Sequence, residues 1–183
     1  MTEMETGSPR RRGLLIGGVA AAAALAGAGL AWRKQFPGAQ PAQSEEVAEL
    51  WRMSFDTPAG TRLDMQTLRG KPLLLNFWAT WCPPCVEEMP MLDAFYKQSA
   101  SKNWQVVGLA IDQPTAVRTW LGRTPVTFPI GLAGLGGSEL SRNLGNLAGA
   151  LPFTIVIGAA GNVLQRKMGR VTTAELAQWQ DMS

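Results

Sequence analysis

The chain has 183 residues with two cysteines and no histidine, and its formal net charge is +3. Without histidine, a Cys-His protease lacks its base, and c-type haem attachment through Cys-x-x-Cys-His is excluded. A zinc site built on the two thiols would need two more strong ligands, which the chain does not supply. Five of the 17 basic residues and two of the 14 acidic ones precede residue 35, which leaves twelve of each beyond it. The folded part is therefore neutral overall, and we expect no nucleic-acid partner.

An uncharged run occupies residues 13–31, which are mostly Ala, Gly and Leu. Arg10, Arg11 and Arg12 precede it, and Arg33-Lys34 follow it. As a helix rising ~1.5 Å per residue, this run just spans a hydrocarbon core of ~30 Å. We interpret residues 13–31 as a transmembrane anchor or a signal segment.

Two interpretations of this leader remain open. One is an uncleaved anchor, with the basic region of residues 1–12 inside. The other is a cleaved signal of twin-arginine type, since Arg11-Arg12-Gly13-Leu14-Leu15 fits that pattern. We favour the anchor, because no Ala-x-Ala site directly follows the run. Both place the domain of residues 45–183, after a tether at residues 32–44, in a bacterial periplasm, either anchored in the inner membrane or soluble after cleavage.

The first elements of the domain are a hairpin, a strand and a helix. Residues 50–55 and 61–65 flank a Pro- and Gly-containing turn at residues 56–60, which predicts a β-hairpin. Residues 72–79 form a nearly continuous apolar run, which is typical of a strand buried on both faces. Residues 82–99 predict a helix with one apolar stripe.

The middle of the domain predicts two further helices and two strands. Residues 104–111 predict a second buried strand, after which Asp112 can cap a helix over residues 114–123. A short strand is expected at residues 126–131 and a short helix at residues 138–144.

The last elements are two strands and a closing helix. The strands are expected at residues 153–157 and 163–168, joined by a Gly/Asn turn. Thr172 and Glu175 have the spacing of a capping box that opens the helix. Strands that alternate with helices and end in a hairpin predict an α/β domain with a mixed sheet.

The segment Cys82-Pro83-Pro84-Cys85 holds both cysteines, between the predicted strand and helix. The unpaired N–H groups and partial positive charge of a helix N-terminus favour a thiolate on Cys82. Cys85 lies one turn further on, close enough to attack a mixed disulfide. Pro83 and Pro84 remove two backbone donors, so we expect a moderately lowered thiol pKa and a reducing couple.

Residues 76–85, Asn-Phe-Trp-Ala-Thr-Trp-Cys-Pro-Pro-Cys, resemble the TlpA/ResA/CcmG branch of the thioredoxin superfamily. Pro90 stands where thioredoxin-like proteins kink this helix, and Leu151-Pro152 stands where they have a cis-proline. The resemblance covers roughly residues 45–180. It implies a thioredoxin-like fold, with a central mixed β-sheet flanked by helices, an N-terminal β-hairpin and an inserted helix-strand segment.

The resemblance also implies catalytic roles. Cys82 is expected to attack and Cys85 to resolve. Glu88 matches the active-site glutamate of the ResA type and is expected to exchange protons with Cys85; the alternative is an ordinary solvated helix glutamate. A cis Pro152 would place the backbone of Leu151 beside the disulfide, where a substrate strand can pair with it.

Substrate contacts are expected from four residues, namely Trp81, Pro83, Pro84 and Leu151. The chain departs from the family in two respects. Asn76 stands where thioredoxin has a buried Asp, and Asn cannot take a proton. Phe153-Thr154 replaces the usual Thr-Thr after the proline, which predicts a more apolar substrate edge.

The predicted function is thiol–disulfide exchange as a reductant, without a cofactor or metal. The implied substrates are disulfides of apocytochromes c or of copper-site proteins, and the implied electron donor is a membrane thiol reductase. A disulfide oxidant or isomerase is one alternative. Another is a Cu(I) metallochaperone that uses Cys82 and Cys85 as ligands.

Overall fold

The computed structural model of the chain describes residues 45–182. The predicted basic region, membrane segment and tether of residues 1–44 lie outside the described residues. Among residues 45–182, no helix combines the length and the apolar character needed to cross a membrane.

A seven-stranded mixed sheet forms the centre of the fold, in the order β2-β1-β5-β4-β3-β6-β7. Strands β3, β4 and β5 are parallel, whereas β6 runs antiparallel to β3, β7 to β6, and β1 to both β2 and β5. The strands are β1 Ser54–Asp56, β2 Arg62–Asp64, β3 Leu73–Trp78, β4 Gln105–Ala110, β5 Ile130–Leu132, β6 Phe153–Ile157 and β7 Val163–Met168. This arrangement confirms the predicted mixed sheet and N-terminal hairpin.

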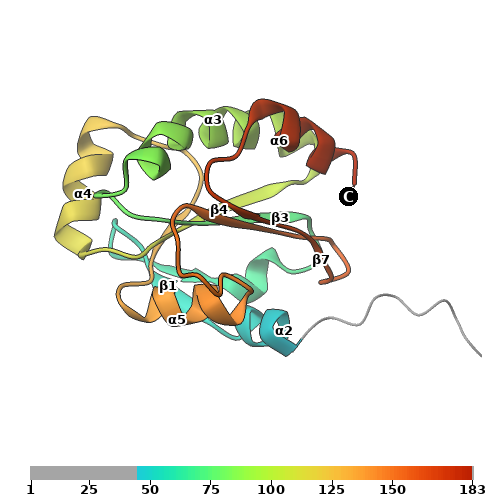
Figure 1. Cartoon of the computed structure of the whole chain (residues 1–183), viewed down its shortest axis with the longest axis horizontal. Helices are drawn as coiled ribbons and strands as arrows, with labels where there is room; N and C mark the ends of the chain where they lie inside the picture. Colours follow the sequence, from blue (N-terminus) through green and yellow to red (C-terminus); the bar gives the residue numbers. More distant parts are fainter. Residues whose placement is uncertain (1–44, 183) are drawn as a thin grey trace, which may run out of the picture. The chain divides into compact units, whose positions relative to one another are not determined.

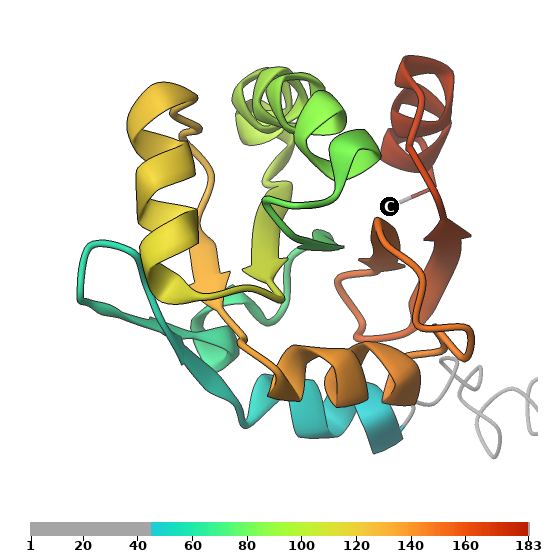
Figure 2. The same ribbon diagram turned by 60° about the vertical axis from the view of Figure 1, so that its left-hand side comes forward.

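Helices cover both faces of the sheet. The helical segments are α2 Glu45–Trp51, α3 Pro83–Ser99, α4 Pro114–Arg123, α5 Gly136–Asn143 and α6 Thr173–Gln180, with short 3₁₀ turns η1 Met65–Leu68 and η2 Ala100–Lys102. Helices α3 and α6 lie on one side of the sheet, and α2 and α5 lie on the other (Figures 1 and 2). The buried apolar side chains form two clusters, one toward α3, α4 and α6 and one toward α2 and α5.

Strand β3 divides its side chains between these two clusters. Leu74 and Trp78 belong to the cluster under α3, whereas Leu73, Leu75 and Phe77 belong to the opposite one. All six residues of the strand are buried, as its apolar sequence predicted. Because side chains alternate along a strand, Asn76 faces the same side as Leu74 and Trp78, toward α3.

Three predicted boundaries were wrong. The chain folds into helix α2 up to Trp51, where we expected the hairpin to begin at residue 50; Val47, Leu50 and Trp51 form the buried side of that helix. The strand predicted at residues 126–131 is β5, Ile130–Leu132. The helix predicted at residues 138–144 begins earlier, as α5. The capping box of α6 was predicted correctly: the Thr172 and Glu175 side chains each bond the other residue's backbone.

Candidate active site at the start of helix α3

Cys82 and Cys85 form a disulfide at the start of helix α3, with an S–S distance of 2.04 Å. Cys82 is the N-cap residue, and prolines occupy the first two helical positions. The N–H groups of Cys85 and Val86 both donate to the carbonyl of Cys82, at 3.0 and 3.2 Å. Cys85 is completely buried, whereas Cys82 keeps 4% of its surface exposed. The two sulfurs are therefore unequal, with Cys82 nearer the solvent.

The segment before Cys82 is held by Asp112. One carboxylate oxygen of Asp112 accepts hydrogen bonds from the backbone N–H and the hydroxyl of Thr80, at 2.9 and 2.5 Å. Thr80 follows β3 and Asp112 follows the parallel neighbour β4, so both lie at the same edge of the sheet. The prediction that Asp112 caps α4 was wrong, because Gln113 is the N-cap residue there.

Glu88 lies three residues after Cys85 and is completely buried. One of its carboxylate oxygens accepts a hydrogen bond from Asn76 Nδ2 at 2.8 Å, and the other accepts from the N–H of Val171 at 2.9 Å. Burial raises the pKa of Glu88 above its ordinary value; these two hydrogen bonds and the positive charge of Arg170 oppose that rise without cancelling it. Glu88 is therefore not the solvated helix glutamate of the alternative interpretation.

The place of Asn76 in the sheet allows its side chain to donate a hydrogen bond to Glu88. Its register partner on β6 is Thr154, and Asn76 Nδ2 also donates to the Thr154 hydroxyl at 3.0 Å. The Oδ1 atom of Asn76 is buried without a hydrogen-bond partner in the described structure. Asn76 thus acts as a donor to the buried carboxylate, and the only ionisable member of this trio is on the helix.

The surface beside the disulfide is apolar. Trp81 is 65% exposed, Pro83 is exposed and Pro84 is half-buried. Leu151 is half-buried and packs against the apolar cluster that contains both cysteines. The peptide bond between Leu151 and Pro152 is cis, as the resemblance implied.

Sequence reasoning missed one charged pair near the site. Arg170 Nη1 donates to Glu87 Oε2 at 2.7 Å, and both side chains are about half exposed. This pair joins α3 to the loop between β7 and α6, next to Val171, whose N–H binds Glu88. Because adjacent residues on a helix do not share a face, the sequence could indicate that one of Glu87 and Glu88 faces solvent and the other faces the sheet. It could not indicate that Arg170 would be the partner of Glu87.

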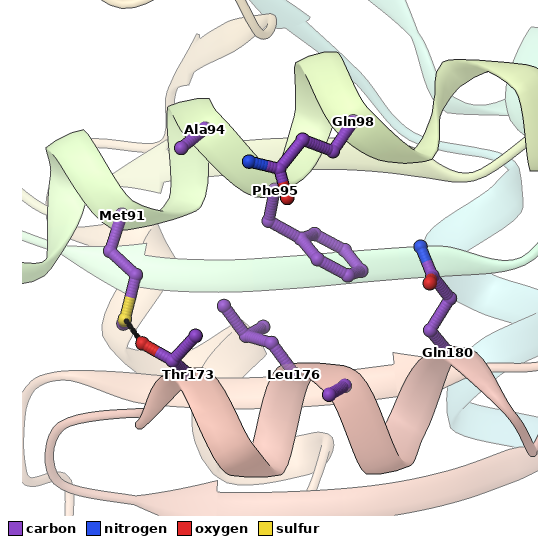
Figure 3. A pocket seen from close by; sticks show the side chains of 8 residues that line it. Met91, Ala94, Phe95, Gln98, Thr173, Leu176 and Gln180 are labelled. Atoms are coloured by element: carbon purple, nitrogen blue, oxygen red, sulfur yellow. Dashed lines mark hydrogen bonds between the residues drawn. The ribbon is translucent and has the colours of Figure 1, made fainter.

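A hollow between α3 and α6 does not belong to the site. Its lining includes neither cysteine and comes from Met91, Ala94, Phe95, Gln98, Thr173, Leu176, Ala177 and Gln180 (Figure 3). Met91 points toward Thr173, whose hydroxyl donates to the Met91 sulfur at 3.5 Å. Within residues 45–182, no three His, Cys, Asp or Glu side chains gather to hold a metal ion.

A buried Cys-x-x-Cys disulfide at a helix start, together with a cis-proline before β6 of a thioredoxin-like sheet, defines a thiol–disulfide oxidoreductase. The sequence matches the Redoxin family over residues 43–180, and the chain belongs to that family.

Several characterised relatives carry the same activity in their names. The chain is 29% identical to the thiol-disulfide oxidoreductase ResA of Bacillus thuringiensis over 121 residues, which cover 66% of this chain and 68% of that protein. It is 27% identical to the sporulation thiol-disulfide oxidoreductase A of Bacillus subtilis, over 82% of this chain and 88% of that protein. A solved thiol:disulfide interchange protein from Chlorobium tepidum has 30% identity and a TM-score of 0.62, with 71% of this chain and 91% of that chain covered.

Proposed function

We propose that this oxidoreductase works as a reductant of disulfides in substrate proteins. The observation that carries the proposal is the first turn of α3. Two prolines remove backbone donors, and the next two N–H groups bond the Cys82 carbonyl, so this turn offers no free N–H to a Cys82 thiolate. A weakly stabilised thiolate makes the reduced form less stable, and a couple whose reduced form is less stable donates electrons more readily.

The reaction takes place in two exchanges. The Cys82 thiolate attacks one sulfur of a substrate disulfide, the substrate S–S bond breaks, and one substrate thiolate leaves. Cys85 then attacks Cys82, which forms the disulfide seen in the structure and releases the second substrate thiolate. Two electrons pass to the substrate, and a separate reductant must return the protein to the dithiol form.

Glu88 is proposed as the acid–base partner of Cys85. Cys85 must lose its proton to attack, and Glu88 is a buried carboxylate one helical turn away. Its raised pKa brings it closer to that of a thiol, which favours proton transfer between them. Asn76 and Val171 hold the carboxylate in place by their hydrogen bonds.

The substrate is proposed to lie across Trp81, Pro83, Pro84 and Leu151. Trp81 offers a large exposed apolar surface beside Cys82. The backbone of Leu151, which precedes the cis-proline, is proposed to pair with an extended substrate strand. The Phe153 side chain that follows is buried in the cluster toward α2 and α5, so it does not form the apolar substrate edge that the sequence predicted.

The proposed setting is outside the cytoplasm, on the periplasmic side of a bacterial inner membrane. The support is the sequence of residues 1–44, in which a basic region precedes an uncharged run. The proposed substrates are apocytochromes c or copper-site proteins, and the proposed electron donor is a membrane thiol reductase. A soluble form produced by leader cleavage has the same chemistry.

The reduction potential of the Cys82–Cys85 couple tests the direction of the reaction. The protein would be equilibrated with glutathione redox buffers of known ratio, and its dithiol fraction measured by alkylation and mass spectrometry. We expect a potential near or below the ~−270 mV of thioredoxin. A potential near the ~−120 mV of DsbA would instead identify an oxidant. Stoichiometric tight Cu(I) binding without disulfide reductase activity would favour the metallochaperone.

A further inference from the structure

The segment that leads into the cis peptide bond, residues 144–151, lies between α5 and β6 and belongs to no strand. A segment without sheet partners needs other contacts to fix its backbone. Those contacts come from two side chains, Asn146 and Arg166.

Asn146 closes the segment on itself. It is completely buried, and its Nδ2 donates to the carbonyl of Ala150 at 2.8 Å. Its backbone N–H donates to the carbonyl of Ser141, and its own carbonyl accepts from the N–H of Gly149, both at 2.9 Å. One residue thus ties the end of α5 to Ala150, directly before Leu151.

Arg166 ties the start of the segment to the sheet. Its Nε donates to the carbonyl of Leu144 at 2.7 Å. The same side chain lies close to Gly145: a Cβ at Gly145 would come within 2.6 Å of Arg166 Nε, and the φ of +111° at Gly145 favours glycine. Arg166 is paired with Ile155 of β6, the strand that follows the cis-proline.

The backbone is therefore held by hydrogen bonds on both sides of Leu151. The carbonyl of Pro152 is occupied by the N–H of Gly169 at 2.8 Å. By contrast, neither the N–H nor the carbonyl of Leu151 has a hydrogen-bond partner among the described residues. The Leu151 side chain packs against both buried clusters, one of which contains the disulfide.

We propose that Asn146 and Arg166 are positioning residues for substrate binding. They hold residues 144–151 so that the free backbone groups of Leu151 face an extended substrate strand beside Cys82. This inference rests on the proposed pairing of substrate with Leu151. Neither side chain takes part in the exchange of sulfur bonds, so their loss should affect polypeptide substrates and leave the dithiol chemistry intact.

The test compares two oxidised substrates, with dithiothreitol as the reductant. One is a synthetic peptide that contains a Cys-x-x-Cys disulfide, and the other is hydroxyethyl disulfide, which has no backbone to pair. In Arg166→Met we expect the peptide KM to rise about three- to tenfold, the range for one or two weakened hydrogen bonds. The kcat for the peptide, kcat/KM for hydroxyethyl disulfide, and the reduction potential should stay unchanged.

Matched variants separate positioning from folding and from charge. Arg166→Lys keeps a donor for the Leu144 carbonyl and should restore most of the peptide KM. Lys167→Met is the control for charge, because it removes a cation from the same strand. Lys167 pairs with Glu175 and not with residues 144–151, so this variant should leave the peptide KM unchanged. Asn146→Ala should raise the peptide KM as Arg166→Met does. Because Asn146 is buried, the melting temperature of the Asn146→Ala protein is measured as well, to detect any loss of folding. Arg166 is exposed, so its variants keep the test valid if Asn146→Ala does not fold.

Two results would overturn the inference. One is a peptide KM within about twofold of the unmodified protein in Arg166→Met, which is less than one hydrogen bond contributes. The other is an equal loss of activity on both substrates, which would mean general damage to the site. If the unmodified protein reduced neither substrate, the proposed function itself would fail, which is distinguishable from both results.

Discussion

At Glu88, burial and hydrogen bonding have opposite effects on the pKa of the carboxyl group. The carboxylate has no exposed surface, and it accepts one hydrogen bond on each oxygen. Burial penalises the ionised form more than the two donors and Arg170 favour it, so the pKa of Glu88 is raised. In the folded protein, the carboxyl group of Glu88 therefore keeps its proton to a higher pH than it does in the unfolded chain.

We expect Glu88→Gln to flatten the pH dependence of stability. For the unmodified protein, the contribution of Glu88 to the free energy of unfolding falls as pH rises from the ordinary carboxyl range through the raised pKa. Glutamine does not titrate, so this fall should disappear. Urea midpoints of the oxidised protein between about pH 4 and about pH 9 measure the effect, in a range that begins near the ordinary carboxyl pKa and extends well above it.

The same variant tests the proton-transfer role. In the reduced protein, Glu88→Gln should shift the pH profile of thiol alkylation, because Cys85 loses its partner. Glu87→Gln is the matched control: its carboxylate is about half exposed and pairs with Arg170, so the profile should change little. An unchanged profile in Glu88→Gln across about pH 5 to 9 would refute the role.

At the scale of elements, the start of helix α6 is part of the site. Val171 gives its N–H to Glu88, and the next residue, Thr172, is the N-cap of the helix. The Thr172 hydroxyl accepts from the N–H of Glu175 at 3.2 Å, and Glu175 returns a hydrogen bond to the N–H of Thr172 at 2.8 Å. The capping box thus fixes the backbone that holds the buried carboxylate.

Thr172→Ala should lower the free energy of unfolding by about 1 kcal/mol, the usual cost of losing a side-chain N-cap. Urea unfolding at pH 7 measures the loss. Gln178→Ala, an exposed position in the same helix, serves as the control and should leave stability nearly unchanged. A loss in Thr172→Ala below about 0.3 kcal/mol would show that the cap contributes little here.

At the scale of the whole molecule, the disulfide is linked to folding. Both cysteines belong to the buried cluster that also contains Leu74, Trp78 and Trp179. The redox state therefore changes the stability of the whole domain, and the difference in stability is tied to the reduction potential through the thermodynamic cycle. A reductant differs from DsbA, which oxidises because its reduced form is the stabilised one.

We expect the oxidised protein to unfold at a higher urea concentration than the reduced protein. If the folded protein is more reducing than an unfolded Cys-Pro-Pro-Cys peptide, the oxidised form must be the more stable one. Each ~30 mV of difference between the two reduction potentials corresponds to ~1.4 kcal/mol of difference in the free energy of unfolding. Urea midpoints with and without excess dithiothreitol measure the difference, and equal slopes in the two states would show that the same surface unfolds. A more stable reduced form would argue for an oxidant.

Much of the site follows from local sequence. The apolar run of β3 and its two-residue alternation place Asn76 on one face, and the Cys82–Cys85 spacing puts both thiols on the first turn of α3. The apolar positions and turn residues also predict the mixed sheet and the hairpin. These features depend on neighbours a few residues apart, so the sequence by itself determines them.

The tertiary structure decided the rest, because the remaining contacts depend on register between distant segments. Val171 reaches Glu88 across 83 positions, and Thr154 reaches Asn76 across 78. Asp112 binds Thr80 because two parallel strands end side by side. Arg166 likewise meets Leu144 only once β7 pairs with β6. No local pattern encodes these pairings; the packed sheet brings them together.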